Sequence, residues 1–162
     1  MATEIERKFL VRSDAWRDGV EKSIAIRQFY LAVSADRSIR VRVSDEGSAK
    51  LTLKFGSHLP HRQEFEYDIP LGEAAEMRPY AIGEPIEKTR HHVRHGGYLY
   101  EVDVFAGRLD GLIVAELETA DDVSPSRLPP WIGREVTGDQ RYSNALLALG
   151  DVPDTTLHAL AG

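Results

Sequence analysis

The sequence contains no cysteine among its 162 residues. This absence excludes a disulfide framework, a thiolate zinc site and a cysteine nucleophile. Long apolar runs are also missing, because no stretch approaches the roughly 20 residues that a membrane-spanning helix needs. The N-terminal segment Met1–Glu6 is acidic and lacks the basic-then-apolar plan of a signal peptide. The sequence therefore predicts a soluble, cytoplasmic protein with no membrane partner.

Positive charge is in deficit, with 20 basic against 26 acidic side chains and a net charge of -6. Nucleic-acid-binding proteins usually present a basic face, so this balance argues against a DNA or RNA partner. The apolar fraction of 42% and the charged fraction of 28% are typical of a chain that folds. Because there is no linker, internal repeat or low-complexity stretch, a single domain over residues 1–162 is expected.

Glycine, proline and polar turn residues recur at short intervals, and the segments between them alternate with period two. Eight segments are predicted as strands: Glu4–Val11, Lys22–Ala32, Ser38–Ser44, Ala49–Phe55, Arg62–Ile69, Pro85–Arg94, Tyr98–Phe105 and Leu112–Thr119. Helices are few, with candidates at Leu71–Arg78, Ser143–Leu149 and Asp154–Leu160. The pattern favours a mainly β protein with outer helices (α+β), its antiparallel strands forming a barrel or a sandwich.

The polar face of these strands is unusually rich in charge. A half-buried strand normally has one apolar face and one mixed polar face. For any single strand, a water-facing surface is a sufficient explanation. However, nearly every strand shows the pattern, and neighbouring strands carry like charges, such as Arg40 and Arg42 followed by Lys54. Like charges across strands destabilise a sheet unless a counter-charge lies between them, which favours a closed barrel with a charged lumen.

The candidate lumen residues carry both signs of charge at high density. Six are basic (Lys8, Arg40, Arg42, Lys54, Lys88 and Arg90) and seven are acidic (Glu4, Glu6, Glu64, Glu66, Asp103, Glu116 and Glu118). Arginine and lysine bind phosphate oxygens, and hard cations such as Mg²⁺ bind carboxylates and phosphates together. The mixture therefore indicates a polyphosphate bound with divalent metal.

Several motifs carry a family resemblance over most of the chain. Glu4-Ile5-Glu6-Arg7-Lys8 resembles the N-terminal Glu-x-Glu-x-Lys signature of the CYTH superfamily, also called triphosphate tunnel metalloenzymes. Further matching segments follow in family order: Arg27–Leu31, Arg40–Arg42, Thr52–Lys54, Arg62–Glu66, Glu87–Arg90, Glu101–Phe105, Ala115–Glu118, Glu135–Thr137 and Arg141–Asn144. Phe29 and Tyr100 depart from residues frequent in short members, and neither departure removes a charge.

The resemblance implies an eight-stranded, closed antiparallel β-barrel that binds a triphosphate-containing small molecule together with Mg²⁺ or Mn²⁺. It implies Glu4, Glu6 and Glu118 as principal metal ligands, with Glu116, Asp103, Glu64 and Glu66 supporting that site or holding a second ion. It implies that Lys8, Arg40, Arg42, Lys54, Lys88 and Arg90 bind the triphosphate, with Glu4, Glu6, Lys8 and Lys88 as the catalytic group. Tyr30 is expected to orient substrate or water, or to pack in the barrel wall.

The expected reaction is attack of water on a terminal phosphorus of inorganic tripolyphosphate, releasing orthophosphate. Thiamine or nucleoside triphosphate hydrolysis, a class IV-type adenylate cyclase and a non-catalytic polyphosphate sensor remain alternatives. A sensor would keep its basic residues and lose its metal carboxylates, so the presence of Glu4, Glu6, Glu116 and Glu118 favours an enzyme. The identity of the general base, the number of metal ions and a possible homodimer stay open.

Histidines offer a rival metal site. His91, His92 and His95, or His58 and His61, could bind zinc or nickel. However, adjacent residues of a strand point to opposite faces, so His91 and His92 cannot chelate one ion from regular strand geometry. Surface histidines are therefore the preferred interpretation.

Overall fold

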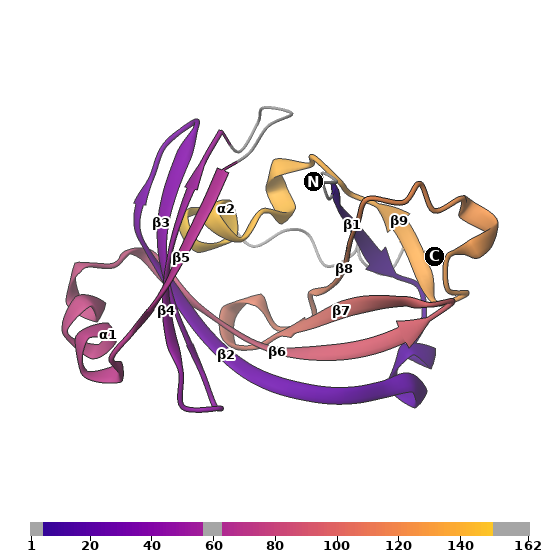
Figure 1. Cartoon of the computed structure of the whole chain (residues 1–162), viewed down its shortest axis with the longest axis horizontal. Helices are drawn as coiled ribbons and strands as arrows, with labels where there is room; N and C mark the ends of the chain where they lie inside the picture. The colour runs from indigo at the N-terminus through magenta and orange to yellow at the C-terminus, as the bar shows by residue number, and fades with distance from the viewer. Residues whose placement is uncertain (1–4, 57–62, 151–162) are drawn as a thin grey trace. The chain divides into compact units, whose positions relative to one another are not determined.

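The computed structural model describes residues 5–56 and 63–150 (Figure 1). Within them lie nine strands: β1 Ile5–Val11, β2 Val20–Val33, β3 Arg37–Ser44, β4 Ala49–Phe55, β5 Gln63–Ile69, β6 Ile82–His95, β7 Tyr98–Phe105, β8 Ile113–Thr119 and β9 Ile132–Glu135. Two α-helices, α1 Leu71–Met77 and α2 Asn144–Leu149, accompany five 3₁₀ turns at Ala15–Gly19, Arg78–Tyr80, Gly107–Leu109, Pro125–Arg127 and Gln140–Tyr142. The prediction of a mainly antiparallel β protein with few helices is confirmed.

The strands follow the order β5-β4-β3-β2-β6-β7-β8-β1-β9 in one sheet. This order is linear for the described residues and ends at β5 and β9, so it differs from the expected closed ring of eight. The additional strand is β9, which pairs with β1 through Phe9 opposite Glu135 and Val11 opposite Ile132. A four-residue strand that contains Gly133 and follows two prolines is too short to give a period-two signal.

The two longest strands extend beyond their predicted bounds. β2 and β6 each have 14 residues, and β6 begins at Ile82, ahead of the predicted start at Pro85. Both predicted helices in the described part of the chain are present, since α1 covers Leu71–Met77 and α2 follows an N-cap at Ser143. Glu4, Arg62 and the candidate helix Asp154–Leu160 lie outside the described residues. No helix in the described part of the chain is long and apolar enough to cross a membrane.

The chain forms two compact units, and each is described by itself. Among the described residues, unit 1 comprises 5–23 and 89–142, and unit 2 comprises 24–56, 63–88 and 143–150. The strands β2 and β6 contribute to both units, because the boundaries fall at residues 23/24 and 88/89. The single domain expected from the sequence stays a prediction.

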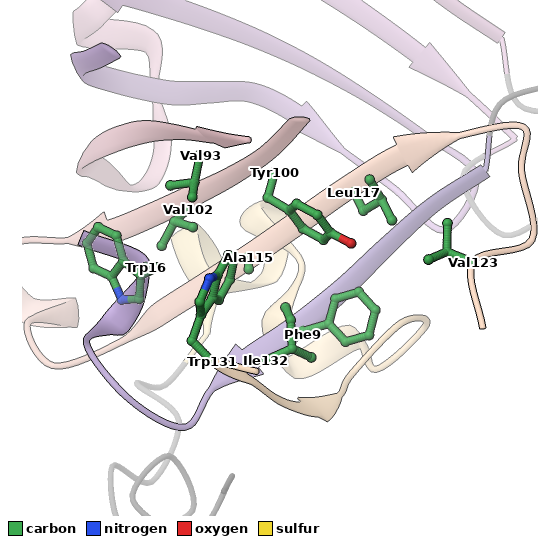
Figure 2. Close-up of a cluster of buried hydrophobic side chains, with 10 residues drawn as sticks. All are labelled: Phe9, Trp16, Val93, Tyr100, Val102, Ala115, Leu117, Val123, Trp131 and Ile132. Carbon is green, nitrogen blue, oxygen red and sulfur yellow. The ribbon is translucent and has the colours of Figure 1, made fainter. Parts of the chain in front are cut away.

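The core of unit 1 packs on one face of β1, β7 and β8 (Figure 2). Phe9, Tyr100 and Leu117 alternate with charged neighbours along their strands, and each is at most 1% exposed. Trp131 stacks edge-on against Tyr100 with ring centroids 5.6 Å apart, and Trp16 from the first 3₁₀ turn is fully buried in the same cluster. The apolar residues of these alternating strands therefore form the core, and the charged residues between them lie on the opposite face of the sheet.

Unit 2 also has an apolar, buried face on its strands, with a smaller core. Phe29, Val41 and Ala49 pack with Ala74 of α1, so α1 covers the apolar side of β2, β3 and β4. Helix α2 lies against the start of β6, where Gly83 has φ +65 and a Cβ on it would collide with the Ala148 carbonyl oxygen. This close approach requires glycine, and it fixes α2 beside β6.

Candidate active site

Five acidic side chains share the charged face of unit 1. Antiparallel pairing places Glu6 opposite Glu118 and Lys8 opposite Glu116, and it places Glu101 opposite Glu116 on the other side of β8. Directly opposed residues lie on the same face of a sheet, and so do residues two apart in one strand. The register thus places Glu6, Lys8, Asp103, Glu116 and Glu118 on one face, and their roles at a site stay a prediction.

Lys8 stands between two of these carboxylates. Its Nζ lies 3.8 Å from Glu6 Oε1 and 3.9 Å from Glu116 Oε1, and its side chain is 16% exposed. These distances are at the outer limit of an ion pair, so the ammonium balances charge without forming a tight hydrogen bond.

Arg90 of β6 is a buried cation of unit 1 that is bound by carboxylates. Its Nε and Nη2 donate to the two carboxylate oxygens of Asp103 at 2.8 and 2.9 Å, and its Nη1 donates to Glu101 at 3.2 Å. Nη2 also lies 3.6 Å from Glu116. Burial lowers the pKa of Arg90, but the charges of Asp103, Glu116 and Glu101 outweigh burial and raise that pKa above its usual value. A metal ion at Asp103 would compete with Arg90 for both carboxylate oxygens.

Cations line the charged face of unit 2. In the register, Tyr30, Arg40 and Thr52 lie side by side across β2, β3 and β4, and Arg42 lies between Gln28 and Lys50. The remaining predicted cation of β4 is Lys54, two positions from Thr52, so it shares this face. Lys88 of β6 is 2% exposed. The alternation in the sequence had predicted the shared face of Arg40, Arg42 and Lys54.

Two amides, the buried Gln28 and the half-buried Asn144, accept hydrogen bonds from two of these cations. Arg42 Nε donates to Gln28 Oε1 at 3.0 Å, and Gln28 Nε2 donates to Asn144 Oδ1 at 3.2 Å. Lys88 Nζ donates to the same Asn144 oxygen at 3.1 Å. The hydrogen bonds therefore connect β3, β2, α2 and β6 within unit 2.

Arg40 has a buried nitrogen that is not satisfied within the described chain. Its Nε is inaccessible to solvent and has no hydrogen-bond partner among residues 5–56 and 63–150. A buried donor without an acceptor costs free energy, which an anion bound at this face would recover. Tyr30, directly opposite Arg40, is 4% exposed, as expected of a residue packed in the wall.

Glu64 and Glu66 occupy a different setting from the other predicted metal ligands. They lie on β5 in unit 2, opposite Lys54 and Thr52, and both are exposed. Glu66 accepts a hydrogen bond from Thr52 at 3.4 Å and lies 3.7 Å from Lys50 Nζ. The other described candidates, Glu6, Asp103, Glu116 and Glu118, all belong to unit 1.

The donor chemistry of unit 1 fits a hard divalent cation, because carboxylate oxygens are the ligands that Mg²⁺ and Mn²⁺ prefer. Among residues 5–56 and 63–150, however, no three histidine or acidic side chains converge tightly enough to form a metal centre by themselves. Glu4, a predicted ligand, lies outside these residues. The carboxylates of unit 1 therefore fit a divalent cation in their chemical type and in sharing one face of the sheet.

The rival histidine site gains no support from the described histidines. His91 Nδ1 is 2.7 Å from Ser23 Oγ, and its ring lies 5.1 Å from that of Trp16. His92 is on the opposite side of the strand, 3.8 Å from Glu101. His58 and His61 lie outside the described residues.

The site residues predicted from the sequence leave out five polar residues of the two charged faces: Gln28, Lys50, Thr52, Glu101 and Asn144. Four of them could have been found from strand periodicity, because Gln28, Thr52 and Glu101 are each two residues from a predicted site residue and Lys50 is four residues from Lys54. Asn144 gave no such signal, since it lies in α2 and meets Gln28 across 116 positions of sequence.

Comparisons with known proteins agree with this arrangement. The CYTH domain model matches residues 2–145. Inorganic triphosphatase from Acetivibrio thermocellus is 45% identical over 149 residues, covering 91% of this chain and 94% of the relative. Inorganic triphosphatase from Nitrosomonas europaea is 41% identical over 151 residues, covering 91% and 97%.

Solved structures give the same result at the level of the fold. A crystal structure of an inorganic triphosphatase superposes with a TM-score of 0.70 at 36% identity, covering 94% of this chain and 98% of that one. A conserved hypothetical protein from Pyrococcus furiosus shares the fold alone, with a TM-score of 0.57 at 19% identity over 77% and 83% of the chains. The family match and the two curated relatives together show that this chain belongs to the CYTH domain family.

Proposed function

We propose that this chain is a divalent-metal-dependent phosphoanhydride hydrolase that cleaves inorganic tripolyphosphate. The observation that carries the proposal is that the chain has two charged faces, one of carboxylates in register on β1 and β8 in unit 1 and one of cations in register on β3 and β4 in unit 2. The relatives that are named inorganic triphosphatases, at 45% and 41% identity, support the substrate class.

The cations would bind the phosphate oxygens. Arg40 and Arg42 offer planar forks that suit two oxygens at once, whereas Lys8, Lys54 and Lys88 act as mobile point charges. The buried Nε of Arg40 supports its role, because it lacks an acceptor in the described part of the chain. Arg90 already donates to Asp103 through two nitrogens. We therefore assign Arg90 two roles: its positive charge attracts the phosphates without contacting them, and its hydrogen bonds position the Asp103 carboxylate. Tyr30, beside Arg40, would orient the substrate.

The carboxylates would hold the metal. Glu6 and Glu118 face each other in register, and Glu4 precedes Glu6 by two positions, so these three are our principal ligands for Mg²⁺ or Mn²⁺. Glu116 supports them, and Glu64 and Glu66 are candidates for a second ion. Asp103 is a weaker candidate, because it would have to release Arg90. A bound divalent ion neutralises phosphate oxygens and lowers the pKa of a coordinated water.

The chain's own residues then have defined tasks in the hydrolysis. The arginine and lysine side chains hold the non-bridging oxygens and align the terminal phosphorus with the attacking water. A carboxylate of the Glu4, Glu6 and Glu118 group accepts the proton of that water. The bond from the terminal phosphorus to its bridging oxygen breaks, and the products are orthophosphate and pyrophosphate. The closed tunnel implied by the family resemblance is part of this proposal, since it would keep bulk water from the phosphates.

The test is a product-resolved assay of the full chain with Mg²⁺ or Mn²⁺ against tripolyphosphate, ATP and thiamine triphosphate. Orthophosphate release from tripolyphosphate, abolished by a chelator and by Glu6→Gln, is the expected result. Glu76→Gln, on the exposed side of α1, is the matched control and should leave the rate unchanged. Cyclic AMP with pyrophosphate from ATP would make the protein a cyclase. Metal-dependent tripolyphosphate binding without turnover would make it a sensor and contradict the hydrolase.

A further inference from the structure

Amide side chains are scarce in this chain, yet two of them meet in the interior of unit 2. The sequence has one asparagine and three glutamines. Gln28 is fully buried, and it is hydrogen-bonded to Asn144, the single asparagine. Each of these two amides also accepts a hydrogen bond from a cation of the charged face, Arg42 for Gln28 and Lys88 for Asn144.

The two cations fix the orientation of both amides. Guanidinium and ammonium groups only donate, so each amide must turn its oxygen toward the cation. With Gln28 Oε1 facing Arg42, Gln28 Nε2 faces Asn144 and donates to the oxygen that also accepts from Lys88. A flip of either amide would set two donors against each other and leave a buried polar group unsatisfied. The four side chains therefore have one self-consistent arrangement.

Amides position a cation differently from carboxylates. A carboxylate partner would bring a full negative charge and compete with an anionic ligand for the same N–H groups, as Asp103 does at Arg90. An amide oxygen accepts the hydrogen bond and carries no net charge. The arrangement therefore orders Arg42 and Lys88 and adds no negative charge beside them.

We propose that Gln28 and Asn144 are positioning residues for the triphosphate, which hold Arg42 and Lys88 in a common geometry through neutral hydrogen bonds. The inference rests on the proposed triphosphatase function. Asn144 thereby gives α2 a role in substrate binding, because its side-chain oxygen accepts hydrogen bonds from both Gln28 of β2 and Lys88 of β6.

The substitution Asn144→Asp separates geometry from charge. The new carboxylate keeps an oxygen for both Gln28 Nε2 and Lys88 Nζ, so the fold should be retained with a melting temperature close to that of the wild type. We expect the KM for tripolyphosphate with Mg²⁺ to rise about tenfold or more, because the added charge competes with phosphate for Lys88, while kcat at saturation changes little. Calorimetric titration with tripolyphosphate and Mg²⁺ should show an equal loss of affinity.

The matched control is Gln63→Glu, which makes the same kind of change in the same unit. Gln63 is exposed and lies opposite Phe55, on the face that Lys54 does not share. Its KM and affinity should match those of the wild type. If Asn144→Asp is folded and its KM and affinity stay within twofold of the wild type, the positioning role is overturned. An equal rise in KM for Asn144→Asp and Gln63→Glu would also overturn the positioning role, since the added negative charge would then raise KM wherever it is placed in the unit.

The experiments distinguish a failure of the proposed hydrolase function from a failure of the positioning role. A wild-type chain that binds tripolyphosphate without hydrolysing it would contradict the hydrolase, and the calorimetric comparison of Asn144→Asp with Gln63→Glu would still decide the positioning role. A wild-type chain that neither binds nor hydrolyses tripolyphosphate would overturn both.

Discussion

The two units hold their charges in different ways. In unit 1 the buried arginine is bound by carboxylates, with Asp103 contacting two nitrogens of Arg90 and Glu101 a third. In unit 2 the cations Arg42 and Lys88 are hydrogen-bonded to the neutral amides of Gln28 and Asn144. The buried cation of unit 1 is thus bound by opposite charges, whereas Arg42 and Lys88 of unit 2 each donate a hydrogen bond to a group without charge.

This difference suggests a division of labour. A balanced network such as that around Arg90 resists deformation, because removing one partner leaves a buried charge alone. An amide partner adds no negative charge that would compete with an anionic ligand. Under the proposed function, unit 1 would place the metal-binding carboxylates and unit 2 would place the phosphate-binding cations. Four substitutions or conditions test this contrast, in order of falling effect.

The largest effect is expected from Asp103→Ala in unit 1. Asp103 is 1% exposed, so its loss leaves the Arg90 guanidinium buried with its main partner gone. Breaking a buried pair from one side typically costs about 3 to 5 kcal/mol. Denaturant unfolding of the wild type and the variant measures this difference. Asp68→Ala, which removes the exposed partner of Lys50, is the control and should unfold at nearly the wild-type midpoint. Equal losses from both substitutions would remove the contrast between buried and exposed pairs.

Gly83→Ala should follow, because it moves α2 in unit 2. The residue has φ +65 and faces the Ala148 carbonyl oxygen, so a methyl group meets both backbone strain and a collision. We expect a loss of about 2 kcal/mol in the free energy of unfolding. If Asn144 positions Lys88 through α2, the KM for tripolyphosphate should rise as well. Gly72→Ala in α1 is the control, since a Cβ there meets open space. A fully stable Gly83→Ala would show that α2 is not fixed at this point.

The alternation of residues predicted the faces of the sheet but not every partner across it. The face shared by Lys8 and Glu116 and the face shared by Arg40 and Thr52 follow from period two, and the register agrees. The contact of Gln28 with Asn144 depends on where α2 packs, which no local pattern encodes. The strand β9 was missed because four residues carry too little periodicity to predict a strand.

Ser143→Ala should have a smaller effect on the same helix. The Ser143 side chain accepts a hydrogen bond from the Leu146 backbone N–H at 3.2 Å and caps α2. Loss of an N-cap costs about 1 kcal/mol. Thermal unfolding should show a modest decrease in melting temperature, whereas Ser126→Ala, whose hydroxyl contacts only Ser124 in the described hydrogen bonds, should show almost none. A larger loss of stability in Ser143→Ala than in Gly83→Ala would contradict the expected order of effects.

The smallest effect is the pH dependence set by His91 in unit 1. Burial, with a contribution from Arg17, lowers the pKa of His91 below its ordinary value of 6.5. The folded state therefore favours the neutral ring, so its stability is complete above about pH 6.5 and is lost as the pH falls toward the lower folded pKa. Melting temperatures measured from pH 7.5 to pH 5 should fall less in His91→Gln than in the wild type. Parallel curves for the two proteins would contradict this assignment.

The central claim is that the carboxylates of unit 1 serve the metal and the cations of unit 2 serve the triphosphate. Initial rates of orthophosphate release over a grid of Mg²⁺ and tripolyphosphate concentrations test it directly in three proteins: the wild type, Glu6→Gln and Arg40→Gln. We predict that Glu6→Gln raises the Mg²⁺ concentration needed for half activity or abolishes turnover, and that Arg40→Gln chiefly raises the KM for tripolyphosphate. If both variants shift the same parameter equally, or neither shifts any, the division between the two charged faces is wrong.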